Sequence, residues 1–120
     1  MTQSKTNVGL FSVRDLNKDL AIGVDVGGTK IYGMLIDSKG RVLNKIKVDT
    51  QADKSKQIIV NNIIKVIKKL MENKVIGIGI GVPGIVDSDG NLLLIPNVNK
   101  LNGINLKKII EKKFLVKTKV

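Results

Sequence analysis

The segment from Ile22 to Ile36, which reads IGVDVGGTKIYGMLI, is compatible with few structures other than a β-hairpin. Apolar residues alternate before a Gly27-Gly28 pair, and a second run of β-forming residues follows it, as in two strands joined by a tight turn. Because glycine has no Cβ atom, we expect this turn to reach positive φ and its backbone to approach a ligand closely.

The residues at this turn suit the recognition of a phosphate. Successive N–H groups of a turn through Gly27 and Gly28 form a concavity that binds anions. Thr29 adds a hydroxyl donor and Lys30 adds a positive charge. Asp25 would repel a bare phosphate, so its presence predicts a Mg²⁺ ion between the two, held by Asp25 through water. The alternative is an ordinary Asp-Gly-Gly hairpin turn that binds nothing.

Composition excludes several classes of protein. The chain has 120 residues, of which 42% are hydrophobic, as expected for one globular domain with its own core. It contains no cysteine and no histidine, which excludes disulfides, an ordinary zinc site, a cysteine nucleophile and a histidine base within these residues. No apolar run reaches the ~18 residues of a membrane span and no signal peptide is visible, so we expect a cytoplasmic protein without a membrane partner.

The net charge of +11 raises the question of nucleic-acid binding. The aromatic residues are only Phe11, Tyr32 and Phe114, too few for a base-stacking platform, and the lysines are spread along the expected helices. We therefore do not expect nucleic acid as a partner. The charge would still attract a polyphosphate ligand over long range.

The order of expected elements indicates an α/β fold with a mixed sheet. Residues 1–19 predict a flexible lead-in, and residues 20–120 predict one domain. We expect strands at 20–26, 31–37, 42–49, 75–82, 92–95 and 115–120, and helices at 55–73 and from the N-cap Asn105 onward. The first three strands would be antiparallel neighbours, with parallel crossovers after them.

Three further patterns in the sequence bear on a ligand site. Gly77, Gly79 and Gly81 leave one face of their strand bare, so a helix or a ligand could approach it closely. Residues 79–84 satisfy G-x-G-x-x-G, but no helix follows, so we reject a dinucleotide fingerprint. The acidic turn that begins at Asp87 lacks the spacing of a calcium loop and predicts a β-turn.

Three motifs, at residues 25–30, 79–84 and 96–97, together resemble the N-terminal half of the ROK family of sugar kinases and sugar-responsive repressors. They read DVGGTK, GIGVPG and PN, and the likeness covers about residues 20–120. The resemblance implies a ribonuclease-H-like domain of the actin/hexokinase type, with a five-stranded mixed sheet and flanking helices.

The resemblance also implies roles for individual residues. The hairpin through residues 25–30 would face the phosphates of ATP and the Mg²⁺ ion. Gly84 would line a sugar pocket with its backbone, and Asn97 would stand near the same pocket. A turn-capping role for Asn97 stays open. Leu101 stands where many relatives carry tryptophan.

Other parts of the family pattern would lie beyond residue 120. These are an Asn-Asp pair whose aspartate acts as general base, a zinc-binding His/Cys motif and a second domain. We therefore expect an N-terminal fragment of an ATP-dependent hexose kinase of the glucokinase type, inactive alone, with ATP and a small-molecule sugar as ligands. Whether the full-length parent is a homodimer, and which sugar it uses, stay open.

Two other functions are alternatives to the kinase. The first is the sugar-sensing domain of a repressor of the same family. Such repressors carry a winged helix-turn-helix before the first strand, and the residues before Leu20 show no two-helix pattern, so we favour the kinase. The second is a natural one-domain module that binds a sugar or a phosphate.

Overall fold

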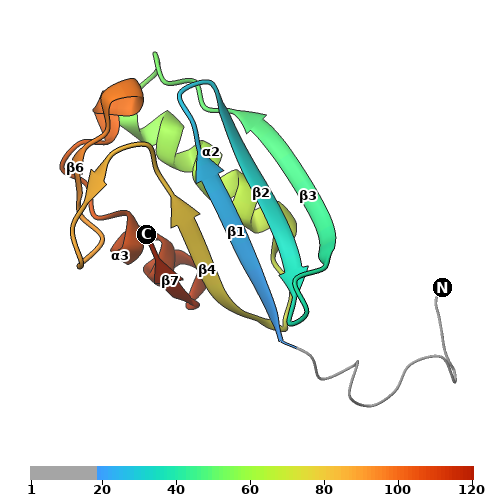
Figure 1. The fold of residues 1–120 in the computed structure, drawn as a ribbon. Coiled ribbons are helices and arrows are strands. Elements are labelled where there is room, and N and C mark those ends of the chain that lie inside the picture. Colours follow the sequence, from blue (N-terminus) through green and yellow to red (C-terminus); the bar gives the residue numbers. More distant parts are fainter. Residues whose placement is uncertain (1–18) are drawn as a thin grey trace, which may run out of the picture.

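The structure is a computed structural model that describes residues 19–120, so the expected lead-in lies outside the described residues except for Asp19. One sheet carries both α-helices on the same face (Figure 1). The elements in chain order are β1 (Leu20–Val26), β2 (Lys30–Asp37), β3 (Val42–Asp49), α2 (Lys56–Leu70), β4 (Val75–Gly81), β5 (Ile85–Val86), β6 (Leu92–Leu94), the 3₁₀ helix η1 (Pro96–Leu101), α3 (Leu106–Phe114) and β7 (Lys117–Lys119).

The main sheet has the strand order β3-β2-β1-β4-β7. β1 pairs antiparallel with β2, and β2 with β3, while β4 runs parallel to both β1 and β7. Helices α2 and α3 make the two parallel crossovers, as the sequence predicted. The expected fold class, a mixed five-stranded α/β sheet with flanking helices, is confirmed.

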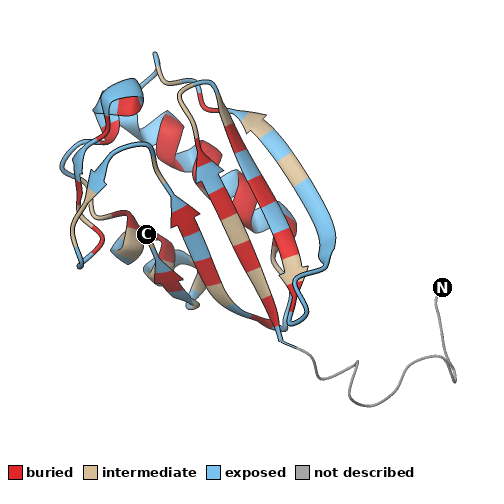
Figure 2. Cartoon of the chain, in the orientation of Figure 1, coloured by how far each residue is buried: buried red, intermediate tan, exposed pale blue. Residues whose placement is uncertain are grey.

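Alternating side chains divide the strands between a buried inner face and an exposed outer face. The stripes of buried residues along β1, β2 and β4 make this period of two visible (Figure 2). From the inner face, Ile22, Ile31 and Ile78 pack in one core with the apolar stripe of α2. Burial of this apolar surface drives the sheet and helix together.

Helix α2 begins directly after the N-cap residue Ser55 and ends earlier than the sequence predicted. The hydroxyl of Ser55 accepts a hydrogen bond from the backbone N–H of Ile58 at 3.2 Å, which satisfies one of the free donors at the helix start. The expected helix extended to residue 73. It stops at Leu70 because Met71 adopts an extended backbone with φ −66° and ψ 135°.

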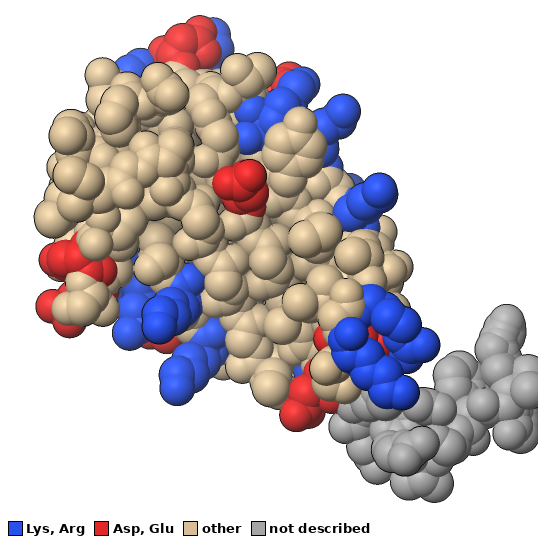
Figure 3. Space-filling view, viewed as in Figure 1, with Lys and Arg blue, Asp and Glu red and all other residues tan. Residues whose placement is uncertain are grey.

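The outer face of the sheet is not covered by any described helix. A Cβ atom built on Gly79 would meet no atom within 4 Å, so neither α2 nor α3 makes the close approach that the glycines of β4 allow. Tyr32 and Met34 remain 50% and 43% exposed on this face. Its centre carries one acidic group among uncharged residues, and both basic and acidic side chains lie around the rim (Figure 3).

Two local features differ from the expected elements. After β6, the residues from Pro96 form η1, which the sequence did not predict, with Val98 and Leu101 buried. The last strand is shorter than residues 115–120, because Leu115 adopts a left-handed conformation with φ 57° as the C-cap of α3. No helix among residues 19–120 is long and apolar enough to cross a membrane.

Gly33 on β2 sets how closely α2 can lie on the sheet. A Cβ atom there would be 2.3 Å from Val66 Cγ1 and 2.8 Å from Leu70 Cδ1. We expect Gly33→Ala to lower the free energy of unfolding by about 1–3 kcal/mol through overpacking, measured by urea denaturation. Gly23→Ala is the matched control, because a Cβ atom on Gly23 meets nothing within 4 Å. Equal stabilities of the two variants would contradict this packing.

The turn between β2 and β3 is held by Asp37. Its buried carboxylate accepts hydrogen bonds from the backbone N–H groups of Lys39 and Arg41, each at 2.9 Å, and from Arg41 Nε at 2.7 Å. The Arg41 amide is the main reason that the pKa of Asp37 lies below its ordinary value, with the Arg41 side chain and the Lys39 amide adding to it.

A lowered pKa makes this turn sensitive to acid. Asp37 contributes stability that is present above the unfolded-state pKa of about 3.9 and is lost as pH falls through the lower folded-state pKa. Asp37→Asn should therefore reduce the fall in unfolding free energy between about pH 5 and pH 2, measured by urea denaturation at each pH. Asp53→Asn, which removes an exposed carboxylate, is the control. The same pH profile for Asp37→Asn and wild type would refute this role.

Candidate functional site

The β1–β2 hairpin ends in the turn that the sequence proposed for phosphate binding. Val26 pairs with Ile31, and the N–H of Gly27 donates to the carbonyl of Lys30 at 2.8 Å. The expectation of positive φ is wrong, because neither Gly27 nor Gly28 adopts left-handed backbone. The glycines are required by close contacts instead, since a Cβ atom on Gly27 would lie 2.9 Å from the Lys30 oxygen.

The turn presents hydrogen-bond donors that the described part of the chain does not use. The backbone N–H groups of Gly28 and Thr29 donate to no acceptor among residues 19–120. Thr29 is exposed, so its hydroxyl is accessible as well. Neighbouring free amides at a glycine turn form a concavity that suits an anion.

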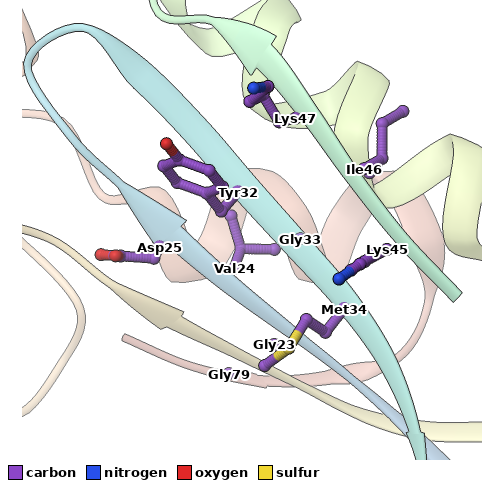
Figure 4. Close-up of a pocket in the computed structure, with 10 residues that line it drawn as sticks. All are labelled: Gly23, Val24, Asp25, Tyr32, Gly33, Met34, Lys45, Ile46, Lys47 and Gly79. Carbon is purple, nitrogen blue, oxygen red and sulfur yellow. The ribbon is translucent and has the colours of Figure 1, made fainter. Parts of the chain in front are cut away.

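Asp25 lies beside this turn, near the carboxyl end of β1. It pairs with Gly81, the last residue of the parallel neighbour β4, and the Asp25 Oδ1 atom is 3.9 Å from where a Gly81 Cβ atom would lie. The side chain is exposed and projects away from Tyr32 and Met34 (Figure 4). The carboxyl ends of parallel strands are a common location for ligands in α/β sheets.

The acidic residues do not form a ready metal cage. Among residues 19–120, no group of three or more His, Cys, Asp or Glu side chains could hold a metal ion. Within the same part of the chain, the Asp25 carboxylate makes no hydrogen bond or ion pair with another residue. A Mg²⁺ ion at this turn would therefore need water and phosphate oxygens for its other ligands, which suits its preference for oxygen ligands.

Lys30 is engaged with a partner that the sequence analysis did not identify. Its ammonium forms an ion pair with Asp49, the residue directly opposite on β3. The hydrogen bond and the charge of Asp49 raise the pKa of Lys30, and the same contacts lower the pKa of Asp49. Both side chains are partly exposed, so a phosphate would compete with Asp49 for a lysine that is already charged.

Asn97 comes from a distant part of the sequence and lies against the hairpin turn. A Cβ atom built on Gly28 would be 3.1 Å from the Cβ atom of Asn97. Asn97 is exposed near the start of η1, directly after Pro96. The structure thus brings together two motifs, at residues 25–30 and 96–97, that the sequence analysis could link only by resemblance.

Gly84 has a packing reason for lacking a side chain. A Cβ atom there would be 2.0 Å from the carbonyl oxygen of Leu94 and 2.9 Å from the Cα atom of Ile95. Close contact with the β6 segment therefore requires glycine even in the absence of a ligand. Leu101 likewise belongs to the interior, because its side chain is fully buried in the core.

A separate hollow of about 720 Å³ lies on the outer face of the sheet (Figure 4). Its walls are mainly apolar and its edge reaches Asp25. Of the proposed site residues it includes Asp25 alone, without the turn glycines, Gly84 or Asn97. The lining residues are Gly23, Val24, Asp25, Tyr32, Gly33, Met34, Lys45, Ile46, Lys47 and Gly79.

Thr50 contacts the hairpin turn, and the sequence did not predict this contact. Its side chain is fully buried, and its hydroxyl donates to the carbonyl of Gly27 at 2.7 Å. The only signal in the sequence is a polar residue directly after β3, which is too common to indicate a role. Its contact with the turn depends on tertiary structure.

The chain is similar in sequence to known proteins. A xylose repressor from Caldicellulosiruptor bescii is 33% identical over 108 residues, which span 82% of this chain and 27% of the repressor. An N-acetyl-D-glucosamine kinase from Aliivibrio salmonicida is 36% identical over 97 residues, which span 76% of this chain and 30% of the kinase.

Among solved structures, a ROK family glucokinase from Streptomyces griseus, in complex with glucose and AMPPNP, superposes with a TM-score of 0.72. The two are 34% identical, and the match covers 82% of this chain and 31% of the glucokinase. The chain thus spans about a quarter to a third of the length of these relatives. The family model for ROK proteins matches residues 21–120, and the chain therefore belongs to the ROK family.

Proposed function

We propose that this chain forms the ATP-phosphate-binding part, and part of the sugar pocket, of an ATP-dependent hexose kinase of the glucokinase type. The observation that carries the proposal is the free pair of amides at Gly28 and Thr29 with the exposed Asp25 carboxylate beside them. Free amides occur at many hairpin turns, and the exposed carboxylate beside them is the part of the combination that a magnesium-bound phosphate would require.

Each residue of the site has a role in this proposal. The amides of Gly28 and Thr29, with the Thr29 hydroxyl, would bind phosphate oxygens, and Lys30 would add positive charge. Asp25 would hold Mg²⁺ through water. Mg²⁺, when bound, neutralises charge on the transferred phosphoryl group.

The sugar side of the proposal rests on fewer observations. Asn97 lies against the phosphate turn, so a sugar hydroxyl near its carboxamide would also be near the phosphates. Gly84 would contribute backbone only, from the segment directly after β4. The relatives act on different sugars or respond to them, so the sugar of this protein is left open.

The chain is proposed to be inactive alone. Phosphoryl transfer needs a group that orients or deprotonates the attacking hydroxyl. Asp25 is committed to Mg²⁺ in this proposal, and the base is expected in a part of the fold beyond residue 120. The whole protein would supply the second wall of the cleft that closes around ATP and sugar.

A sugar-sensing domain of a repressor is the second candidate, because xylose repressors match as much of this chain as the kinases do. A sensor needs the sugar pocket but not the phosphate turn. The intact turn with Asp25 favours the kinase. Sugar binding without any binding of Mg-ATP would reverse that preference.

The role proposed for Asp25 predicts a change in ATP affinity whose direction depends on whether magnesium is present. With Mg²⁺ present, Asp25→Ala should weaken ATP binding about tenfold or more, because a charged contact to the hydrated ion is lost. With EDTA present, the same variant should bind ATP as well as wild type or better, because a carboxylate that repels phosphate is gone. Isothermal titration calorimetry of the full chain measures both.

Asp89→Ala is the control for loss of one negative charge, since Asp89 is exposed in the β5–β6 turn. It should leave ATP affinity unchanged under both conditions. Equal weakening of ATP binding by Asp25→Ala with and without Mg²⁺ would indicate a structural role for Asp25 and would reject the magnesium assignment.

The turn glycine provides a second prediction. Gly28→Val should abolish measurable binding of Mg-ATP, because its Cβ atom would lie 3.1 Å from Asn97 and its methyl groups would fill the concavity. Gly79→Val is the matched control, as a Cβ atom there meets nothing within 4 Å. Circular dichroism should show both variants folded. Retained binding by folded Gly28→Val would mean that the nucleotide binds elsewhere.

A further inference from the structure

Two buried polar residues outside the proposed site connect helix α2 to the phosphate turn. Thr50 follows β3 directly and is fully buried, and Asn62 lies on α2 with 8% of its surface exposed. Burying a polar group lowers the stability of the fold unless the group is hydrogen-bonded, so the hydrogen-bond partners of these two residues indicate their structural role. Neither residue has a part in the function proposed above.

Thr50 contacts the turn at two points. Its backbone N–H donates to the carbonyl of Thr29 at 2.9 Å, which extends the β2–β3 ladder by one bond. Its hydroxyl donates to the carbonyl of Gly27 at 2.7 Å. The second bond is not part of any ladder and depends on the side chain alone.

The bond to Gly27 determines where the Gly28 amide points. The carbonyl of Gly27 and the N–H of Gly28 belong to one planar trans peptide unit, so they point to opposite sides. Because the carbonyl faces Thr50, the Gly28 N–H faces away from Thr50 and from β3. That N–H is one of the two donors that the described chain leaves free.

Asn62 holds Thr50 in place from the helix. Its Nδ2 group donates to the carbonyl of Thr50 at 3.1 Å and to Oε1 of Gln51 at 2.9 Å. Gln51 has φ 58°, a left-handed conformation that is uncommon for residues other than glycine. These bonds fix the sharp bend after β3 against α2, whose apolar stripe is packed in the core.

We propose that Thr50 is a positioning residue, supported by Asn62, that orients the Gly28 amide for a nucleotide phosphate. The proposal rests on the function assigned to the turn. The hydroxyl fixes the peptide plane before the ligand arrives, so the amide needs no reorientation on binding.

The test compares Thr50→Val, which keeps the shape and removes the hydroxyl, with Thr50→Ser, which keeps the hydroxyl. Calorimetry on the full chain should show Mg-ATP affinity about tenfold weaker for Thr50→Val and near wild type for Thr50→Ser. Asn62→Leu, which loses both donated bonds, should weaken affinity in the same direction. Ile67→Val controls for general loss of stability, because it removes one buried methyl group from the core without changing the turn. The Ile67→Val variant should bind Mg-ATP with wild-type affinity.

A second readout does not require a ligand. Amide hydrogen exchange at Gly27, whose N–H closes the turn, should be about tenfold faster in Thr50→Val than in Thr50→Ser or Ile67→Val. Folded Thr50→Val that binds Mg-ATP like wild type would overturn the proposal. If wild type itself fails to bind Mg-ATP, the function assigned to the turn is wrong. The exchange rates then decide whether Thr50 holds the turn, and unchanged rates overturn that claim too.

Discussion

The packing of α2 against the inner face of the sheet is the contact on which the rest of the structure depends. It covers the buried side chains of β1 and β2, and Gly33 lets the helix come close enough to do so. The same helix carries Asn62, so the contact that builds the core also places the group that holds Thr50. Stability and the geometry of the turn proposed to bind phosphate therefore arise from one helix–sheet interface.

At the hairpin turn, hydrogen bonding is divided between two sides. The carbonyl groups of Gly27 and Thr29 are satisfied by Thr50, while the amides of Gly28 and Thr29 remain available. A turn arranged in this way presents donors to an anion at little cost in reorganisation. The Lys30–Asp49 pair reduces the positive charge there, so backbone amides and Mg²⁺ would supply most of the recognition.

Sequence patterns predicted the strands and helices well because their signals are local. Alternation predicted β1 with its observed limits. The helical stripe predicted α2, and its last apolar residue, Leu70, is where the helix ends, although the expected helix extended to residue 73. The positive φ expected at Gly27 and Gly28 was wrong because glycine can serve close approach as well as unusual backbone. The contacts of Thr50 with Gly27 and of Gly28 with Asn97 join residues far apart in sequence, and no periodicity reveals them.

The most direct test of the account is an NMR titration of the ¹⁵N-labelled chain with Mg-ATP. Binding at the turn predicts that the largest amide shifts occur at Gly28 and Thr29, with smaller shifts at Asn97. The chain carries a net charge of +11, so ATP could also collect on lysines without a defined site. Shifts confined to lysine-rich segments such as the last turn of α2, or to the hollow on the outer face of the sheet, would contradict the central claim.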